Sequence, residues 1–281
     1  MKDHPTFVVG DVHGHRDELA EALQDAGLVD DNDNWTGADA HLWFLGDFVD
    51  RGPDGVGAID LVRSLQRQAP EAGGFVDSLL GNHEILLLGM HRYGDTLVPV
   101  DAAGGPGRSF ERSWAVNGGQ PSDQKALTDE HVEWLTSRRV AAVVADHLLV
   151  HSDTLEYLDW GDTVEEVNDA VRAILTGDDL GQWWDVWRRM TTRFAFRGPE
   201  GVEAANELLQ QLGGERVVHG HSVIADQVGV HPVELDAPHL YAGGKALGID
   251  AGLFAGGPCL VVELPYEPTD ETDADTVSER D

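Results

Sequence analysis

The sequence predicts an α/β fold of the α+β sandwich type, in which two mixed β-sheets pack centrally and are flanked by helices. Within residues 6–80, short β-rich runs alternate with helical periodicity, the pattern of parallel strands joined by crossover helices. Apolar runs return after residue 140 and predict a second sheet packed on the first. Five of the runs end beside Asp, Asn or His. We therefore expect these polar side chains at the carboxyl ends of strands, where open α/β sheets bind ligands.

The first part of the chain contains three predicted strands separated by helices. Thr6–Val9 is a β-rich run, and residues 17–26 after it have helical spacing. The second strand is predicted at 41–45, its helix at 55–68, and the third strand at 74–80. Parallel strands of this kind deliver the residues that follow them to one edge of the sheet.

The rest of the chain is less regular. Residues 91–139 include a Gly/Pro-rich stretch and a helical stretch, and we expect them to form an inserted helical cap. An apolar segment at 140–150 predicts a strand, and residues 162–212 are mostly helical. Residues 267–281 are acidic and rich in Ser and Thr, which predicts a disordered tail after a domain that spans 1–266. Later strands are predicted at 216–218, 247–250 and 259–264.

Charge and composition exclude several classes of protein. The chain has 51 acidic and 19 basic residues and a net charge of −32, which repels nucleic acid and anionic membrane surfaces. No apolar run approaches a membrane span, and the first residues lack the pattern of a secretory signal. The lone Cys259 excludes an internal disulfide framework. We therefore expect a cytoplasmic protein that binds neither nucleic acid nor membrane.

Five short motifs carry most of the chemical information. Asp11 and His13 follow the first strand, and flanking glycines permit a sharp turn there. Carboxylate, amide and imidazole ligands suit manganese, iron or zinc, and two such metals together hydrolyse phosphoesters. Taken alone, the Asp-x-His triplet is equally typical of a carboxylate that caps the next helix. Further apolar runs each end in another candidate ligand, and these are Asp47, Asn82, His151 and His221.

The order of these motifs resembles a known family. The segments 10–14, 46–52 and 81–84 read G-D-x-H-G, G-D-x-V-D-R-G and G-N-H-E, and a later His and a Gly-His follow. This pattern resembles the calcineurin-like metallophosphoesterases. Arg51, directly after the second Asp of its motif, resembles the phosphoprotein phosphatase branch, which includes prokaryotic serine/threonine phosphatases and symmetrical diadenosine tetraphosphatases. Secondary matches lie at 114–119, 187–189 and 249–252.

The resemblance implies a set of metal ligands. Asp11 and His13 would hold the first of two divalent ions, and Asp47 would bridge both ions. Asn82, His151 and His221 would hold the second. The resemblance favours manganese, with iron or zinc as alternatives.

The resemblance also implies residues that act on the substrate. His83 would protonate the leaving oxygen and would be oriented by Asp50. Arg51 would clamp the phosphate, because a guanidinium matches its oxygens bidentately. Asn82, His83 and Arg189 would complete the phosphate-binding set, and Arg188 and Arg193 are neighbouring candidates for the place of Arg189.

Two departures from the family pattern are visible. The chain has Ser152 and Asp153 where the family often has Ala and Gly after the ligand His. His219 precedes the expected Gly-His pair, and we align His221 with the ligand and interpret His219 as structural.

The resemblance thus implies a metallophosphatase catalytic domain. The expected reaction is hydrolysis of a phosphomonoester by a metal-activated hydroxide that attacks phosphorus in line, with phosphoserine or phosphothreonine in a protein as the substrate. A small phosphoester would be a further substrate. The alternatives are a symmetrical dinucleoside polyphosphate hydrolase and a non-catalytic phosphopeptide-binding module, and the second of these would require a lost ligand or acid.

Overall fold

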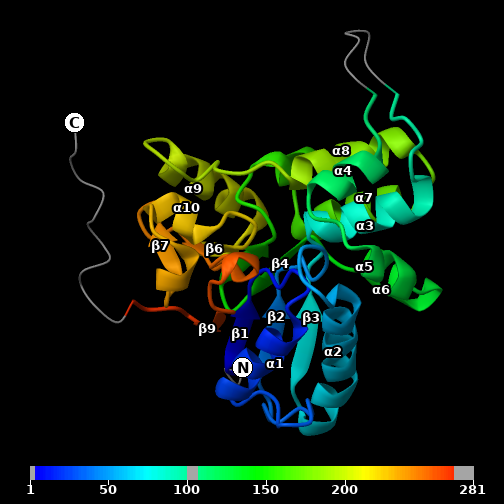
Figure 1. The fold of residues 1–281 in the computed structure, drawn as a ribbon. Helices are drawn as coiled ribbons and strands as arrows, with labels where there is room; N and C mark the ends of the chain where they lie inside the picture. The colour runs from blue at the N-terminus through cyan, green and yellow to red at the C-terminus, as the bar shows by residue number, and fades with distance from the viewer. Residues whose placement is uncertain (1–3, 100–106, 269–281) are drawn as a thin grey trace.

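The computed structural model describes residues 4–99 and 107–268, and these residues form two packed sheets flanked by helices (Figure 1). One sheet has four strands in the order β3-β2-β1-β9, and the other has five in the order β4-β5-β6-β8-β7. The predicted fold class is confirmed. The predicted tail falls mostly on 269–281, which lie outside the described residues.

The first sheet contains the three parallel strands expected from the sequence. They are β1 (Thr6–Val9), β2 (His41–Phe44) and β3 (Phe75–Ser78), connected by helices α1 (Arg16–Asp25) and α2 (Gly55–Gln68). The fourth strand, β9 (Val261–Leu264), pairs antiparallel to β1. The prediction that this late strand belongs to the second sheet is therefore wrong, because strand pairing joins the two ends of the chain.

The second sheet has a parallel centre and antiparallel edges. Its central strands are β5 (His147–Val150), β6 (Arg216–His219) and β8 (Ala246–Gly248), and its edges are β4 (Ala141–Val144) and β7 (His239–Tyr241). The apolar segment predicted as one strand is a hairpin, β4–β5. Its two turn residues, Ala145 and Asp146, both have positive φ, as the tight turns of hairpins require.

The core lies on both faces of the first sheet, because successive strand residues point in opposite directions. In β1, Val8 packs between the two sheets with Leu149 of β5 and Val218 of β6. Its neighbour Val9 belongs to the larger cluster on the helix side. Burial on both faces explains why these strands read as continuous apolar runs.

The helices lie in separate groups around the sheets (Figure 1). Helices α1 and α2 accompany β1–β3, whereas α3 (Asn82–Tyr93) packs against α4 and α8 above the sheets. The described part of the predicted cap, 91–99 and 107–139, contains only the end of α3 and three short helices as regular structure. The remaining helices are α4 (Phe110–Val116), α5 (Pro121–Ala126), α6 (Asp129–Thr136), α7 (Val164–Thr176), α8 (Leu180–Met190), α9 (Gly201–Leu212) and α10 (Ile224–Val228), with 3-10 turns at Ala69–Ala72, Glu156–Asp159, Pro232–Glu234 and Leu253–Ala255. In the part of the chain that the structure describes, no helix is long and apolar enough to cross a membrane.

Candidate metal centre

Asp11 and His13 lie in the loop between β1 and α1, which packs against the loop that follows β2. The backbone N–H of His13 donates to the carbonyl of Asp47 at 2.8 Å. Gly14 approaches Gly52 so closely that an added Cβ would lie 2.7 Å from the Gly52 carbonyl carbon. This contact between the loops places the side chains of Asp11, His13 and Asp47 at one point.

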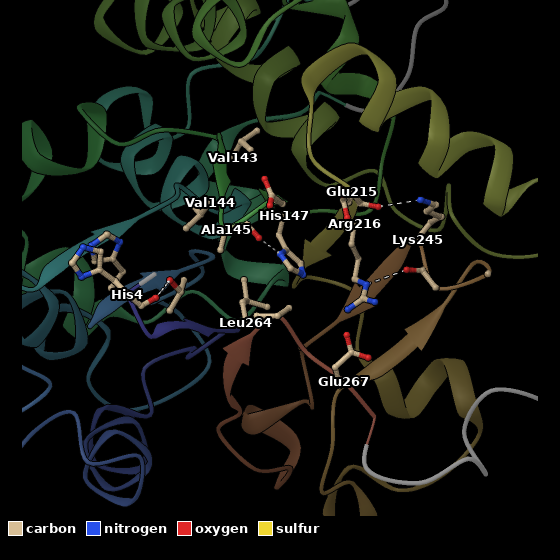
Figure 2. Close-up of a pocket in the computed structure, with 16 residues that line it drawn as sticks. His4, Val143, Val144, Ala145, His147, Glu215, Arg216, Lys245, Leu264 and Glu267 are labelled. Carbon is tan, nitrogen blue, oxygen red and sulfur yellow. Dashed lines mark hydrogen bonds between the residues drawn. The ribbon is translucent and has the colours of Figure 1, made fainter. Parts of the chain in front are cut away.

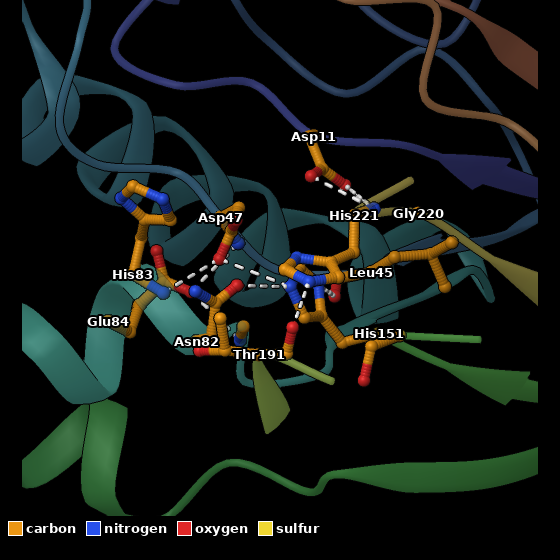
Figure 3. Close-up of polar contacts among 12 residues, drawn as sticks. Asp11, Leu45, Asp47, Asn82, His83, Glu84, His151, Thr191, Gly220 and His221 are labelled. Carbon is orange, nitrogen blue, oxygen red and sulfur yellow. Dashed lines mark hydrogen bonds and ion pairs between the residues drawn. The ribbon is translucent and has the colours of Figure 1, made fainter. Parts of the chain in front are cut away.

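The carboxylate of Asp47 lies between His83 on one side and His151 and His221 on the other (Figure 3). Its Oδ2 is 3.7 Å from Nε2 of His13, and its Oδ1 is 3.4 Å from Nε2 of His151. Potential ligand atoms lie within 4.8 Å of one another in two groups, which are His13, Asp47 and His83, and Asp47, His151 and His221. Asp47 belongs to both groups, so its carboxylate is placed to bridge two cations.

Asp11 connects the two sides of this cluster. Its Oδ2 is 3.9 Å from Nε2 of His13, and its two oxygens accept the backbone N–H of His221 at 3.1 and 3.0 Å. Gly220 makes this approach feasible, because a Cβ at this position would lie 2.1 Å from Oδ1 of Asp11. The Gly-His motif therefore has a steric reason for its glycine.

Backbone carbonyls fix the orientation of three histidine rings. A carbonyl oxygen only accepts, so the ring nitrogen that contacts it carries the hydrogen, and the other nitrogen presents its lone pair. Burial lowers the pKa of all three imidazoles, which keeps them neutral and able to bind metal. The contacts, at 3.0–3.1 Å, run from His13 to Val49, from His151 to Leu45, and from His221 to Thr191.

Acceptor atoms converge at the second group. Nε2 of His151, whose other nitrogen donates to a carbonyl, lies 2.9 Å from Oδ1 of Asn82 and 3.4 Å from Oδ1 of Asp47. Two acceptors at this distance repel each other unless a cation lies between them. The donor set therefore fits a divalent metal ion.

The buried carboxylates also indicate a site for cations. Burial and the charges of Asp250 and Asp47 raise the pKa of Asp11, and burial raises the pKa of Asp250 to about 6. Burial and the charge of Asp47 raise the pKa of Glu84 to about 8. Burial also disfavours the charged form of Asp47, but the four surrounding imidazoles together outweigh burial and lower the pKa of its carboxyl. So many carboxylates in one buried cluster require positive charge, which two divalent ions would supply.

His83, Asp50 and Arg51 form a connected group beside the cluster. Nδ1 of His83 donates to Oδ2 of Asp50 at 2.8 Å, and Oδ1 of Asp50 accepts from Nε1 of Trp114 at 2.8 Å. Nη2 of Arg51 lies 3.3 Å from Nε2 of His83. The backbone N–H of Arg51 donates to the carbonyl of Gly118 at 2.7 Å, so the segment 114–119 supports both Asp50 and Arg51.

The environment of His83 favours its protonated form. Burial lowers the pKa of the imidazole, but the carboxylates of Asp47 and Asp50 outweigh burial, and the pKa is raised. The hydrogen on Nδ1 is committed to Asp50. The second hydrogen of the imidazolium is on Nε2, and the contact of this nitrogen with Nη2 of Arg51 can be a hydrogen bond only when Nε2 is unprotonated.

No role was predicted from the sequence for two residues that support the site, Glu84 and Phe254. Glu84 accepts the backbone N–H groups of Asp47 and Phe48 at 2.8 and 2.7 Å, and so fixes the loop after β2. Phe254 lies with its ring centroid 4.0 Å from Cζ of Arg51 and 5.4 Å from the ring of His13. Glu84 belongs to the G-N-H-E motif and could have been found there, whereas no motif marks Phe254.

The structure separates two candidate arginines. Arg189 pairs through Nε with Asp185 at 2.6 Å and through Nη1 with Glu156 and Asp159, so its guanidinium is occupied by three carboxylates. The pKa of His151 and of His221 is lowered first by burial and also by the charge of Arg193, so this charge is felt at the cluster. The prediction that Arg189 reaches the phosphate thus meets a competing ion-pair network.

The two departures from the family pattern have structural roles. Oδ1 of Asp153 accepts from the hydroxyl of Ser222 at 2.5 Å, and Oδ2 accepts from the N–H of Phe194 at 3.0 Å. Asp153 therefore ties together the loops after β5, β6 and α8. His219 contacts the carbonyl of Gly220 through Nδ1 and the hydroxyl of Tyr241 through Nε2, so both ring nitrogens are already engaged.

A family model described as calcineurin-like phosphoesterase matches residues 4–225, which is most of the chain. The chain belongs to this family. Its members are hydrolases that use two divalent metal ions, so this metallophosphoesterase is a hydrolase enzyme. It is 27% identical to Shewanella-like protein phosphatase 2 of Arabidopsis thaliana, over 91% of this chain and 73% of that protein. It is 28% identical to a symmetrical bis(5'-nucleosyl)-tetraphosphatase of Nitrosomonas europaea, over 62% of this chain and 53% of that protein.

Solved structures share the fold of this metallophosphoesterase. A cold-active protein tyrosine phosphatase has a TM-score of 0.70 at 22% identity and covers 93% of this chain and 73% of its own. A protein serine/threonine phosphatase from Saccharomyces cerevisiae has a TM-score of 0.51 at 14% identity and covers 88% and 67%.

Proposed function

We propose that the chain is a protein phosphatase that hydrolyses phosphomonoesters at a centre of two divalent metal ions. The observation that carries the proposal is the position of Asp47, whose two carboxylate oxygens face two separate groups of ligands. Asp11, His13 and Asp47 would hold one ion. Asp47, Asn82, His151 and His221 would hold the other. When bound, such ions activate water and neutralise charge on the phosphoryl oxygens.

The residues beside the ligands would bind and orient the substrate. Arg51 presents a planar fork of donors and would hold two phosphoryl oxygens. Arg193 would supply the second guanidinium in preference to Arg189, whose donors face three carboxylates. Asn82 and His83 would contact the remaining oxygens.

His83 would provide the proton for the leaving oxygen. Its imidazolium carries the transferable hydrogen on Nε2, 3.3 Å from the guanidinium that would hold the phosphate. Asp50 keeps Nδ1 protonated and stabilises the charge of the ring, and Trp114 fixes Asp50 in turn. Protonation of the leaving group is typically worth about 10²–10⁴ in rate.

We propose phosphoserine or phosphothreonine in a protein as the substrate, with manganese as the native metal, iron or zinc as alternatives, and the cytoplasm as the location. One specific observation favours phosphotyrosine as a second candidate. Phe254 is 37% exposed beside Arg51, and Phe194 is 44% exposed beside Arg193. Two aromatic rings next to the two guanidiniums would stack on the ring of an aryl ester.

The test is a panel of substrates with purified, manganese-loaded protein. Matched peptides that differ only in phosphoserine, phosphothreonine or phosphotyrosine are compared with diadenosine tetraphosphate and with the same peptides lacking phosphate. We expect release of inorganic phosphate from a peptide at a kcat/KM well above that of the dinucleotide. Symmetrical cleavage of diadenosine tetraphosphate as the fastest reaction would replace this proposal by the tetraphosphatase alternative. Peptide binding without turnover would replace it by a non-catalytic binding module.

A further inference from the structure

A cavity of about 1050 Å³, whose lining is shown in Figure 2, lies at the end of the strands opposite to the metal-ligand cluster. Thr6, His41, His147 and Arg216, the first residues of β1, β2, β5 and β6, line it. Five of the six candidate metal ligands follow the other ends of these same strands, and the sixth, Asn82, follows β3. A strand of four residues spans roughly 13 Å, so a small ligand bound in the cavity cannot touch the metal ligands.

The charges of this cavity are arranged by depth. Arg216 and Lys245 are half-buried beside the buried His147, so these two cationic groups are less exposed than the acidic ones, and we call them the inner wall. The acidic groups that line it, which are Asp146, Glu215 and Glu267, are all exposed and form the rim. Because the whole chain has a net charge of −32, a positively charged inner wall is a local exception. An anion that enters the cavity therefore meets positive charge only beyond the rim.

The guanidinium of Arg216 is held in place and keeps free donors (Figure 2). Its Nε donates to the carbonyl of Gly244 at 3.0 Å, and its Nη1 donates to the carbonyl of Tyr266 at 2.7 Å. Two of its five N–H bonds are thereby used, and three remain. Among the described residues, no carboxylate lies within 4 Å of Arg216 or Lys245.

The histidines of the cavity do not form a cation site. The rings of His4 and His41 stack at 4.6 Å, and Nδ1 of His147 donates to the carbonyl of Ala145 at 2.6 Å. In the described part of the chain, these three histidines belong to no group compact enough to hold a metal ion. Their contribution is hydrogen bonding, whereas Arg216 and Lys245 supply the charge.

We propose that this cavity is a second ligand site that binds a small phosphate-bearing anion. A fixed guanidinium with free donors, an ammonium and imidazole groups together match the charge and the tetrahedral oxygens of a phosphate group. The volume lies at the upper end of the range for small-molecule pockets and leaves room for an organic group attached to the phosphate. The proposal concerns binding alone and holds whether or not the proposed phosphatase activity is correct.

The test is calorimetric titration with inorganic phosphate of two double variants with the same change in charge. Arg216→Gln with Lys245→Gln removes the cavity charges, and Arg67→Gln with Lys125→Gln removes two exposed charges on α2 and α5. We expect one fewer phosphate site in the cavity variant, or at least about tenfold weaker binding there, as loss of charge-assisted hydrogen bonds predicts. Identical binding in both variants, measured with full-length folded protein, would overturn the proposal.

A single substitution at the rim tests the same proposal without removing a structural contact. Asp146 has φ +62°, a conformation that Asn adopts readily, so Asp146→Asn is expected to fold. Loss of this negative charge should tighten phosphate binding by about twofold to fivefold at low salt. Unchanged or weaker phosphate binding would contradict the proposed arrangement of charge, with acidic groups at the rim and basic groups inside. A second titration with phenylphosphonate distinguishes the two possible ligands. Tighter binding of phenylphosphonate than of phosphate would indicate an organic phosphate as the ligand, and equal binding would indicate free phosphate.

Discussion

The ligands from the first sheet and those from the second sheet are positioned in different ways. In the first sheet, Asp11, His13 and Asp47 sit in two loops that bind each other through backbone hydrogen bonds, and Glu84 fixes the loop of Asp47. In the second sheet, the side chains of His151 and His221 each depend on one carbonyl from a distant segment. The first sheet also carries the groups expected to act on substrate. On the proposed roles, the proton donor and Arg51 would belong to the first half of the centre, whereas the second half would complete the metal site and supply Arg193.

The largest expected effect separates these two roles with one type of substitution. His83→Asn should retain two metal ions and lose about 10²–10⁴ in kcat, because His83 is the proposed proton donor. His221→Asn should lose one ion and recover part of its activity at high metal concentration. Metal content and kcat are measured for both variants. An equal loss for a phosphopeptide and for 4-nitrophenyl phosphate, which has a good leaving group, would contradict the role of His83.

The next effect concerns phosphate binding by the three arginines. Arg51→Ala should raise KM and weaken inhibition by inorganic phosphate at unchanged metal content, and Arg51→Lys should restore little, because an ammonium lacks the planar fork. Arg193→Ala should act in the same direction. Arg189→Ala serves as the control and should leave phosphate inhibition unchanged, since its partners are Asp185, Glu156 and Asp159. The reverse order for Arg189 and Arg193 would restore the prediction made from the sequence.

A smaller effect should appear in the pH profile. Asp47 and Asp50 raise the pKa of His83, so the acid form persists to higher pH and activity falls as pH rises through that pKa. Asp50→Asn removes one of these carboxylates, and the alkaline limb of kcat should move to lower pH. An alkaline limb at the same pH in both proteins would show that a different group donates the proton.

The smallest expected effect is that of the protein's net surface charge on the choice of substrate. A net charge of −32 should favour phosphopeptides with flanking Lys or Arg over acidic ones, through faster association. We expect a severalfold higher kcat/KM for the basic peptides at low salt, and convergence as salt screens the field. A preference that does not change with salt would assign selectivity to contacts within the site.

The same contrast explains how much could be predicted from the sequence. Asp11, Asp47 and Asn82 could be placed together because they follow three parallel strands, and adjacent strands end at one edge. The partner of His151 could not be predicted, because its ring contacts Leu45, 106 residues away. The sheet to which β9 belongs depends on a similarly long-range pairing.

The ion pairs formed by Arg189 also could not be predicted from the sequence. The resemblance pointed to Arg189, but three carboxylates from α8 and the segment 156–159 occupy that guanidinium in the folded chain. Phe254 follows no motif, and only the fold brings its ring against Arg51. Local motifs therefore predicted which candidate ligands lie together, whereas the environment of each side chain required the structure.

The shared carboxylate of Asp47 is the centre of this account, and metal content tests it most directly. Wild-type protein and two variants with the same loss of charge, Asp47→Asn and Asp39→Asn, are loaded with manganese and assayed for bound metal after removal of free ions. Asp39 is half-buried beside His4 and lies outside the metal-ligand cluster. We predict two ions per chain in the wild type and in Asp39→Asn. Asp47→Asn should fold, lose at least one ion and lose activity. Two tightly bound ions and full activity in Asp47→Asn would contradict the account.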